Sequence, residues 1–382
     1  AAADGNTAAA GLSAELAREA GISNTPGLAA LDALAAGRKP ARPKSADRLT
    51  LVDYRILQAA NARPRLGEVG KLKPALLVAI ARDQKAEPII RQLAAEAAFD
   101  VNAINSVLVA QIYRDSAAAS EAASQQQEAA IERARSFTSA QTTRNANDKL
   151  RHVSDFLKAA AKGQYYDSSL RLASVLLEEI EPGPDIQHFA DAAILLALTA
   201  NDPKIARAWA DTARDRGRRG ASSNWFGLID IAGGGDMPTG SGIRNYAEPA
   251  RFGGSMAALE QMALSGAFKP EVLHKLATVL DALAYQVPIP LWEAASKTPQ
   301  PKDGFLPATG VLSELNQASK DGDIGKVALL TMKAVGPDGP RGTHMIALGD
   351  TIRALKRVGF ETEARQLAVE ALLPDWPYQA GR

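Results

Sequence analysis

The chain has 382 residues, of which 46% are hydrophobic and 23% are charged, and its formal net charge is +1. This composition is typical of a folded protein rather than a disordered one, and the near-zero charge carries no electrostatic signature of nucleic-acid or acidic-membrane binding. The absence of cysteine excludes disulfides, thiolate catalysis and cysteine-ligated metals, and no apolar run reaches the length of about 18 residues that a transmembrane helix needs.

Alanine and leucine dominate the apolar residues, because aromatic residues make up only 5% of the chain. Both are strong helix formers, and small alanine side chains allow helices to approach one another closely. Alternating β-branched and aromatic residues, which would indicate strands, are hard to find. The sequence therefore predicts an all-α protein.

The N-terminal segment 1–11 consists of small and polar residues, and we expect it to be disordered. Two origins fit it: a mature chain whose signal peptide was cleaved after a small residue, or a truncated chain or flexible linker. The first origin, together with the lack of cysteine, favours a periplasmic location. The alternative location is the cytoplasm.

A helical N-terminal region follows over residues 12–138. Apolar periodicity, together with helix start and stop signals, predicts helices at 12–20, 26–36, 47–61, 73–82 and 86–99. The last two are expected to form a helical hairpin joined by a short polar turn.

A longer helix is expected after Asp100, which is a suitable N-cap. Its apolar face is formed by Ile104, Leu108 and Ile112. Over 116–135 the pattern changes to Ala, Ser, Gln and Glu, which we interpret as either an exposed extension or an Ala-lined packing surface. A loop is expected at 139–147.

Internal repeats are the most informative feature of the second half. Four residues each separate two helical patterns, and they form two pairs with spacings of 38 and 37 residues: Gly163 with Asn201, and Gly322 with Gly359. The residue seven positions before each is large and apolar: Phe156, Ile194, Leu315 and Ile352. The outer positions of the same stripe are His152 and Ala159, Ala190 and Ala197, Val311 and Ala318, and Leu348 and Leu355.

Small or modest residues recur five and twelve positions after each separating residue. They are Ser168 and Val175, Ala206 and Ala213, Val327 and Ala334, and Ala364 and Ala371. This pattern resembles the second-helix signature of tetratricopeptide repeats, although the period is longer than their ~34 residues and the aromatic residue near the start of their first helix is missing.

The resemblance implies a right-handed superhelix of stacked helical hairpins over 145–382, with a concave surface that holds a peptide or protein. An irregular helical bundle is the alternative fold. A Gly-rich insertion at about 232–254 interrupts the repeats, because Gly and Pro are costly in a helix. Long loops often carry function, so the candidate partner-binding residues are those beside it: Arg244, Tyr246, Arg251 and Phe252.

No other pattern indicates chemistry. The four histidines lack metal-ligand spacing, and the acidic residues around Asp323 are explained by N-capping. The arginines from Arg207 to Arg219 are interspersed with aspartates and fit a solvated helix end. We therefore expect no catalytic residue, no cofactor, no metal and no nucleic-acid partner.

The leading hypothesis is a non-enzymatic scaffold or adaptor that binds a protein or peptide, in a bacterial cell-envelope or periplasmic assembly. One alternative is the helical domain of an enzyme that processes cell-wall glycans, which would show a pocket holding a carboxylate with a strongly shifted pKa. The other is a structural subunit that forms homo-oligomers through the 116–135 helix.

Overall fold

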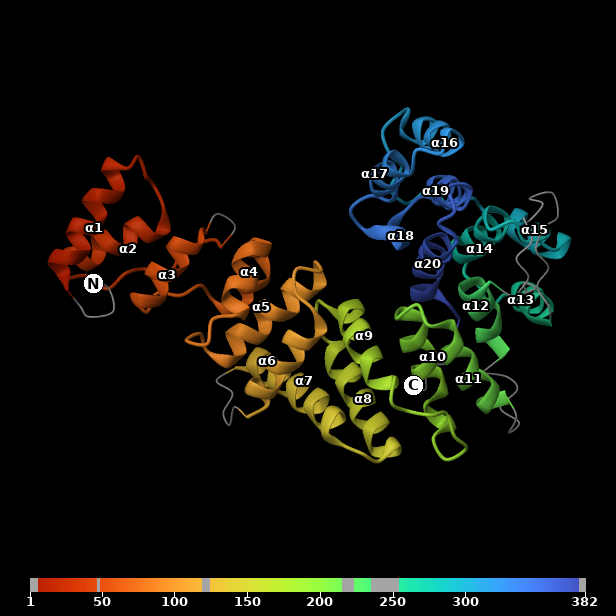
Figure 1. Ribbon diagram of the computed structural model, residues 1–382, viewed down its shortest axis with the longest axis horizontal. Helices are drawn as coiled ribbons and strands as arrows, with labels where there is room; N and C mark the ends of the chain where they lie inside the picture. The colour runs from red at the N-terminus through yellow and green to blue at the C-terminus, as the bar shows by residue number, and fades with distance from the viewer. Residues whose placement is uncertain (1–5, 47–48, 119–123, 215–222, 235–253, 378–382) are drawn as a thin grey trace. The chain divides into compact units, whose positions relative to one another are not determined.

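The computed structural model describes residues 6–46, 49–118, 124–214, 223–234 and 254–377. Within these ranges the protein is all-helical, and one isolated bridge between Phe305 and Thr343 is the sole β pairing. The chain divides into two compact units, Ala1–Leu176 (unit 1) and Leu177–Arg382 (unit 2), which are coloured from red to blue in Figure 1. In the described part of the chain, no helix is both long and apolar enough to cross a membrane.

Unit 1 is a series of helices in which neighbours in the sequence are also neighbours in space. From α4 to α9 each helix packs against the next one in chain order, as Figure 1 shows. Its elements are α1 (Thr7–Glu19), α2 (Pro26–Ala35), α3 (Leu51–Ala59), η1 (Leu66–Lys71), α4 (Pro74–Ala81), α5 (Pro88–Asp100), α6 (Ser106–Ala117), α7 (Gln125–Thr142), α8 (Ala146–Ala160) and α9 (Tyr166–Ser174). A short turn, η2 (Val175–Leu177), spans the boundary between the units.

The prediction of a single long helix after Asp100 is wrong, because two helices, α6 and α7, occupy this part of the chain. Asp100 is the last residue of α5, and its carboxylate accepts a hydrogen bond from Ser168 instead of capping a helix. Asn105 is the N-cap of α6, because its side chain accepts from the backbone N–H of Leu108 at 3.0 Å. A second helix, α7, begins after the cap Ser124 and continues to Thr142, through the start of the expected loop.

The alanines of α7 form a packing surface, which was one of the two interpretations of this segment. Ala130, Ala134 and Ala140 are fully buried, and α7 packs against α5, α6 and α8. Phe137 makes edge-to-face contacts with Tyr113 and Phe156, with ring centroids 5.3 and 5.4 Å apart. Small residues on α7 therefore let its neighbours approach closely enough to enclose an aromatic cluster.

Unit 2 contains contacts between helices that are distant in the sequence. Helix α20 packs against α12, α14 and α19, and α19 also packs against α14, α16 and α17. The elements are η3 (Gln187–Phe189), α10 (Ala190–Thr199), α11 (Pro203–Arg214), α12 (Ser223–Gly233), α13 (Gly254–Leu264), α14 (Pro270–Ala282), α15 (Ile289–Ser296), α16 (Val311–Asp321), α17 (Ile324–Val335), α18 (Gly339–Gly342), α19 (Met345–Arg357), α20 (Glu361–Leu372) and η4 (Leu373–Asp375).

Four helical hairpins have their turns where the sequence predicts them. Gly163 separates α8 from α9, Asn201 separates α10 from α11, Gly322 separates α16 from α17, and Gly359 separates α19 from α20. Asn201, Gly322 and Gly359 have φ angles of 58°, 72° and 91°. This left-handed conformation ends a helix, and Gly and Asn adopt it at the lowest cost.

Most of the repeated positions of these hairpins are buried, although His152 and Val311 are only partly so. The large apolar residue seven positions before each turn has an exposed fraction of 0%: Phe156, Ile194, Leu315 and Ile352. The residue five positions after each turn is buried as well: Ser168, Ala206, Val327 and Ala364. The first hairpin departs at the next repeated position, because α9 ends at Ser174 and leaves Val175 exposed.

Candidate functional site

The candidate partner-binding residues named from the sequence lie outside the described residues. They are Arg244, Tyr246, Arg251 and Phe252. Of the Gly-rich segment at about 232–254, the structure describes residues 232–234 and Gly254. In the described part of the chain, each charged cluster and cavity lies within a single unit.

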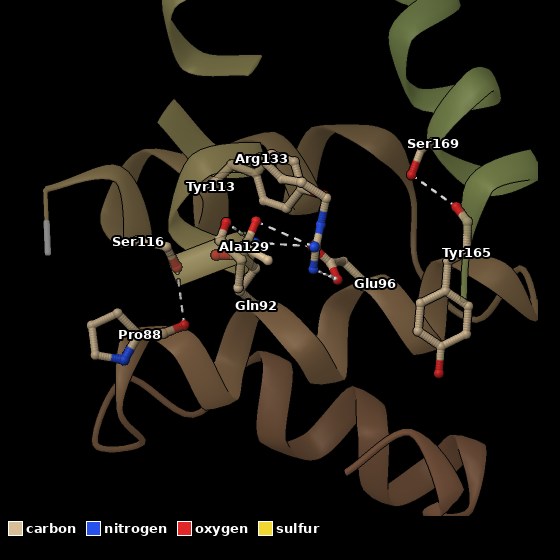
Figure 2. A network of polar contacts seen from close by, with 10 residues as sticks. Pro88, Gln92, Glu96, Tyr113, Ser116, Ala129, Arg133, Tyr165 and Ser169 are labelled. Carbon is tan, nitrogen blue, oxygen red and sulfur yellow. Dashed lines mark hydrogen bonds and ion pairs between the residues drawn. The ribbon is translucent and has the colours of Figure 1, made fainter. Parts of the chain in front are cut away.

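A buried ion pair joins three helices of unit 1 (Figure 2). The carboxylate of Glu96 on α5 accepts from Arg133 on α7, with the guanidinium NH2 2.7 Å from Oε2 and Nε 3.1 Å from Oε1. Tyr113 on α6 donates its hydroxyl to the same Oε1 at 2.9 Å. Gln92 Nε2 lies 2.9 Å from this oxygen and also donates to the carbonyl of Ala130.

The electrostatics of this network match its geometry. Burial and the negative charge of Glu96 raise the pKa of Tyr113 well above its ordinary value, so the hydroxyl stays protonated as a donor. Burial alone would lower the pKa of Arg133, but the contact with Glu96 outweighs it and the net shift is upward. Both residues thus keep the protonation states that the hydrogen bonds require.

The space beside this network is too small for a ligand. Glu96, Tyr113 and Tyr165 line a cavity of about 10 Å³, which is the space of about one water molecule. Burial and the nearby charges of Asp100 and Glu96 raise the pKa of Tyr165. We therefore interpret this network as a connection between helices, not as a binding site.

An open cavity of about 580 Å³ lies in unit 2, where two hairpin turns meet the end of α12. The turn residue Asn201 and the first residue of α11, Pro203, line one part of it. The turn residue Gly359 lines another part, and the end of α12 at Gly233 a third. The repeated turns thus bring residues from separate hairpins to one place.

Arg365 lines this cavity and is held firmly in place, because it is 4% exposed and donates to several acceptors. Its NH1 group donates to the carbonyl of Ile231 at 2.9 Å and to the hydroxyl of Tyr285 at 2.7 Å. Its NH2 group donates to Glu361 one turn earlier on α20. The guanidinium also lies 5.5 Å from the ring centroid of Tyr285, an attractive cation–π arrangement.

A second cation, Lys356 at the end of α19, lines the same cavity. Its ammonium group donates to the carbonyl of Leu283 and lies 3.8 Å from Oε2 of Glu361. Glu361 is therefore shared by two cations, and its side chain is 37% exposed. The cavity carries two positive charges against this one carboxylate.

The start of α20 directs the positive end of its helix dipole at the cavity, although Glu361 and Glu363 lie in this first turn. Its N-cap, Phe360, provides no side-chain acceptor, so the N–H groups at the start of the helix lack a side-chain partner there. Glu361 and Thr362, the first two residues of this helix, line the cavity. Together with Lys356 and Arg365, these groups suit an anionic or hydrogen-bond-accepting ligand.

A smaller groove of about 230 Å³ runs between α16 and α19, the first helices of the two C-terminal hairpins. Arg357 crosses it and donates to Asn316 at 3.0 Å and to Ser319 at 2.7 Å. Arg353 donates to Asp281 at 2.6 Å. This groove has less than half the volume of the cavity at the hairpin turns, so it is the weaker candidate.

The remaining sequence candidates have structural roles. Asp323 caps α17 by accepting from the N–H of Lys326 at 3.0 Å, as its N-cap interpretation predicted. His274 is buried, with Nε2 3.0 Å from the hydroxyl of Thr298. Arg207 forms an ion pair with Asp230 at 3.1 Å. No group of three or more potential metal ligands occurs in the described ranges.

The cluster of Lys356, Glu361 and Arg365 was not predicted from the sequence. The available signal was the position of Arg365, which directly follows the small repeated residue Ala364 and so lies on the buried side of α20. An arginine on such a face requires partners, because burying an unpaired charge is costly. Comparison with known protein families, curated proteins and solved structures finds no match to this chain.

Proposed function

We propose that this protein is a non-enzymatic scaffold that binds a peptide segment of a protein partner. In this proposal the hairpins stack as a tetratricopeptide-like, right-handed α-solenoid. The repeated burial pattern of the four hairpins supports the stacking, as does the packing of α19 against both helices of the preceding hairpin. Solenoids of this kind use surfaces assembled from several repeats to hold extended partners.

The observation that carries the proposal is the cavity of about 580 Å³ at the hairpin turns. Its volume falls in the range of roughly 300–1,000 Å³ that ligand sites occupy. Lys356 and the start of α20 suit a carboxylate, while Glu361 is positioned to accept from a peptide N–H or a basic side chain. The preferred ligand is therefore a short peptide that contains an acidic residue.

A peptide selection tests this function without knowledge of the natural partner. A random peptide library is displayed and selected against the full chain, and the affinity of an enriched peptide is measured by calorimetry. We expect Thr362→Trp, which fills the cavity from an exposed position, to weaken binding at least about tenfold, or about 1.4 kcal/mol.

Glu363→Trp is the matched control, because Glu363 is the next residue, is exposed and does not line the cavity. It should leave the affinity unchanged. Failure to enrich any peptide, or equal binding by the two tryptophan variants, would contradict the proposal.

A further inference from the structure

Helix α1 of unit 1 and helix α17 of unit 2 each expose an apolar face that is not covered within its own unit. On α17, Leu329 is 68% exposed and Met332 is 73% exposed. On α1, Leu12 is 59% exposed and Leu16 is 56% exposed. Contiguous exposed apolar patches mark interaction sites.

The faces form continuous stripes rather than isolated residues. Gly325, Ala328, Leu329 and Met332 follow the i, i+3, i+4, i+7 spacing on the side of α17 opposite its buried residue Val327. Leu12 and Leu16 are one helical turn apart on α1, opposite the buried Ala10 and Ala14. Each helix is thus apolar on two sides, and only one side is covered within its own unit.

The charges beside the two stripes are opposite. Glu15 and Glu19 are exposed along one edge of the α1 stripe, and Lys326 and Lys333 along one edge of the α17 stripe. None of these four residues forms an ion pair with a described residue. When the two helices lie parallel and face each other, helical geometry places the lysine edge against the glutamate edge.

We propose that α1 of one molecule docks in parallel on α17 of a second copy of this chain. The apolar stripes supply the buried contact, and the Glu15, Glu19 and Lys326, Lys333 edges select the partner and its orientation. The surfaces in contact are different, so the interface is heterologous, and it either closes into a ring of copies or extends to longer assemblies. In both cases the contact is independent of the peptide cavity.

Sedimentation velocity of the full chain over an approximately hundredfold range of concentration tests this proposal. We expect a weight-average sedimentation coefficient that rises with protein concentration and that falls when salt is added. The contact is weak because two helix faces bury less area than the ~1,600 Å² of a standard interface. A monomer at every concentration would overturn the proposal.

Charge reversal identifies the surfaces. The variant Lys326→Glu/Lys333→Glu and the variant Glu15→Lys/Glu19→Lys should each remain monomeric, since each places like charges at the contact. All four positions are exposed, so neither variant is expected to perturb folding, and circular dichroism verifies this. An equimolar mixture of the two variants restores opposite charges at every contact and should associate again. Association of either variant alone, or failure of the mixture to associate, would refute the α1–α17 contact.

Discussion

The two units contain the same set of side chains in two different settings. In unit 1 a buried arginine, Arg133, is paired with Glu96 and a tyrosine. In unit 2 the buried Arg365 is likewise paired with Glu361 and a tyrosine. The first carboxylate is 8% exposed and borders a cavity of about 10 Å³, whereas the second is 37% exposed and lines a cavity of about 580 Å³.

This difference shows that residue identity alone does not define a site. Both arginines connect helices, because both are held by acceptors on other elements. In unit 2 the carboxylate of Glu361 also faces the open cavity, where a ligand can reach it. Substitutions should therefore affect mainly stability in unit 1, and both stability and binding in unit 2.

The largest effect is expected for Glu96→Ala. The substitution leaves the buried guanidinium of Arg133 without its counter-ion, which typically costs about 3–5 kcal/mol of unfolding free energy. Urea denaturation of the full chain measures the loss, with exposed Glu132→Ala on α7 as the matched control. A loss close to that of the control would mean that the network contributes little, and peptide binding should be unchanged in either variant.

Arg365→Met is expected to cost about 2–3 kcal/mol, somewhat less than the first substitution. It removes the donors to Ile231 and Tyr285, each worth about 1 kcal/mol, but Glu361 keeps contact with solvent and with Lys356. The same denaturation experiment tests this order, with exposed Glu363→Met as control. If Arg365→Met proved more damaging than Glu96→Ala, the more open cluster would be the more important one for stability.

A smaller and pH-dependent effect is expected for Asp53→Asn. Asp53 forms a capping box with Thr50 and accepts from the N–H of Gly27 at 2.9 Å. Burial alone would raise the pKa of Asp53, but the hydrogen bonds from Thr50, Thr25 and Gly27 lower it below the ordinary 3.8. We expect the substitution to cost about 1–2 kcal/mol at neutral pH.

The sign of the pH dependence follows from the lowered pKa. The contribution of Asp53 is fully present above pH 3.8 and is lost as the pH falls below 3.8 through the pKa of the folded state. The difference in stability between the wild type and Asp53→Asn should therefore shrink over this acidic range. A difference that is constant with pH would contradict an ionised Asp53 in the folded protein.

The smallest effect on stability is expected for Lys356→Met. The hydrogen bond of Lys356 to the carbonyl of Leu283 is worth about 1 kcal/mol or less. Methionine also keeps an unbranched apolar side chain at this position. The affinity for an acidic peptide should nevertheless fall about tenfold or more, because one of the two cations of the cavity is removed. Equal affinity of this variant and the wild type would show that the peptide binds elsewhere.

The hairpin turns were predictable because their requirement is local. Gly and Asn adopt the left-handed conformation between two helices at the lowest cost. Asn201, Gly322 and Gly359 have this conformation, and their identities can be read directly from the sequence. The break between α5 and α6 was also a local feature. Its signal was the cap residue Asn105, but the earlier Asp100 was interpreted as the cap instead. Both cases depend on a few adjacent residues.

The charged cluster of unit 2 was not predictable in this way. Arg365 finds its acceptor on Ile231, in a helix separated from it by 134 positions, and no periodicity within α20 encodes that partner. The residues beside the Gly-rich insertion, Arg244 among them, lie outside the described residues and remain predictions. Local patterns thus indicated the hairpins, whereas long-range packing determined the cavity.

The bond between Arg365 and the carbonyl of Ile231 also has a consequence for synthesis on the ribosome. The Glu96–Arg133 pair of unit 1 spans 37 positions, so it can form soon after its second member emerges. The carbonyl of Ile231 has no Arg365 to bind until 134 further residues have been synthesised. This takes roughly ten seconds at the ribosomal rates of about 5–20 residues per second. During that interval the face of α12 that packs on α20 lacks its partner, and the carbonyl of Ile231 lacks its donor.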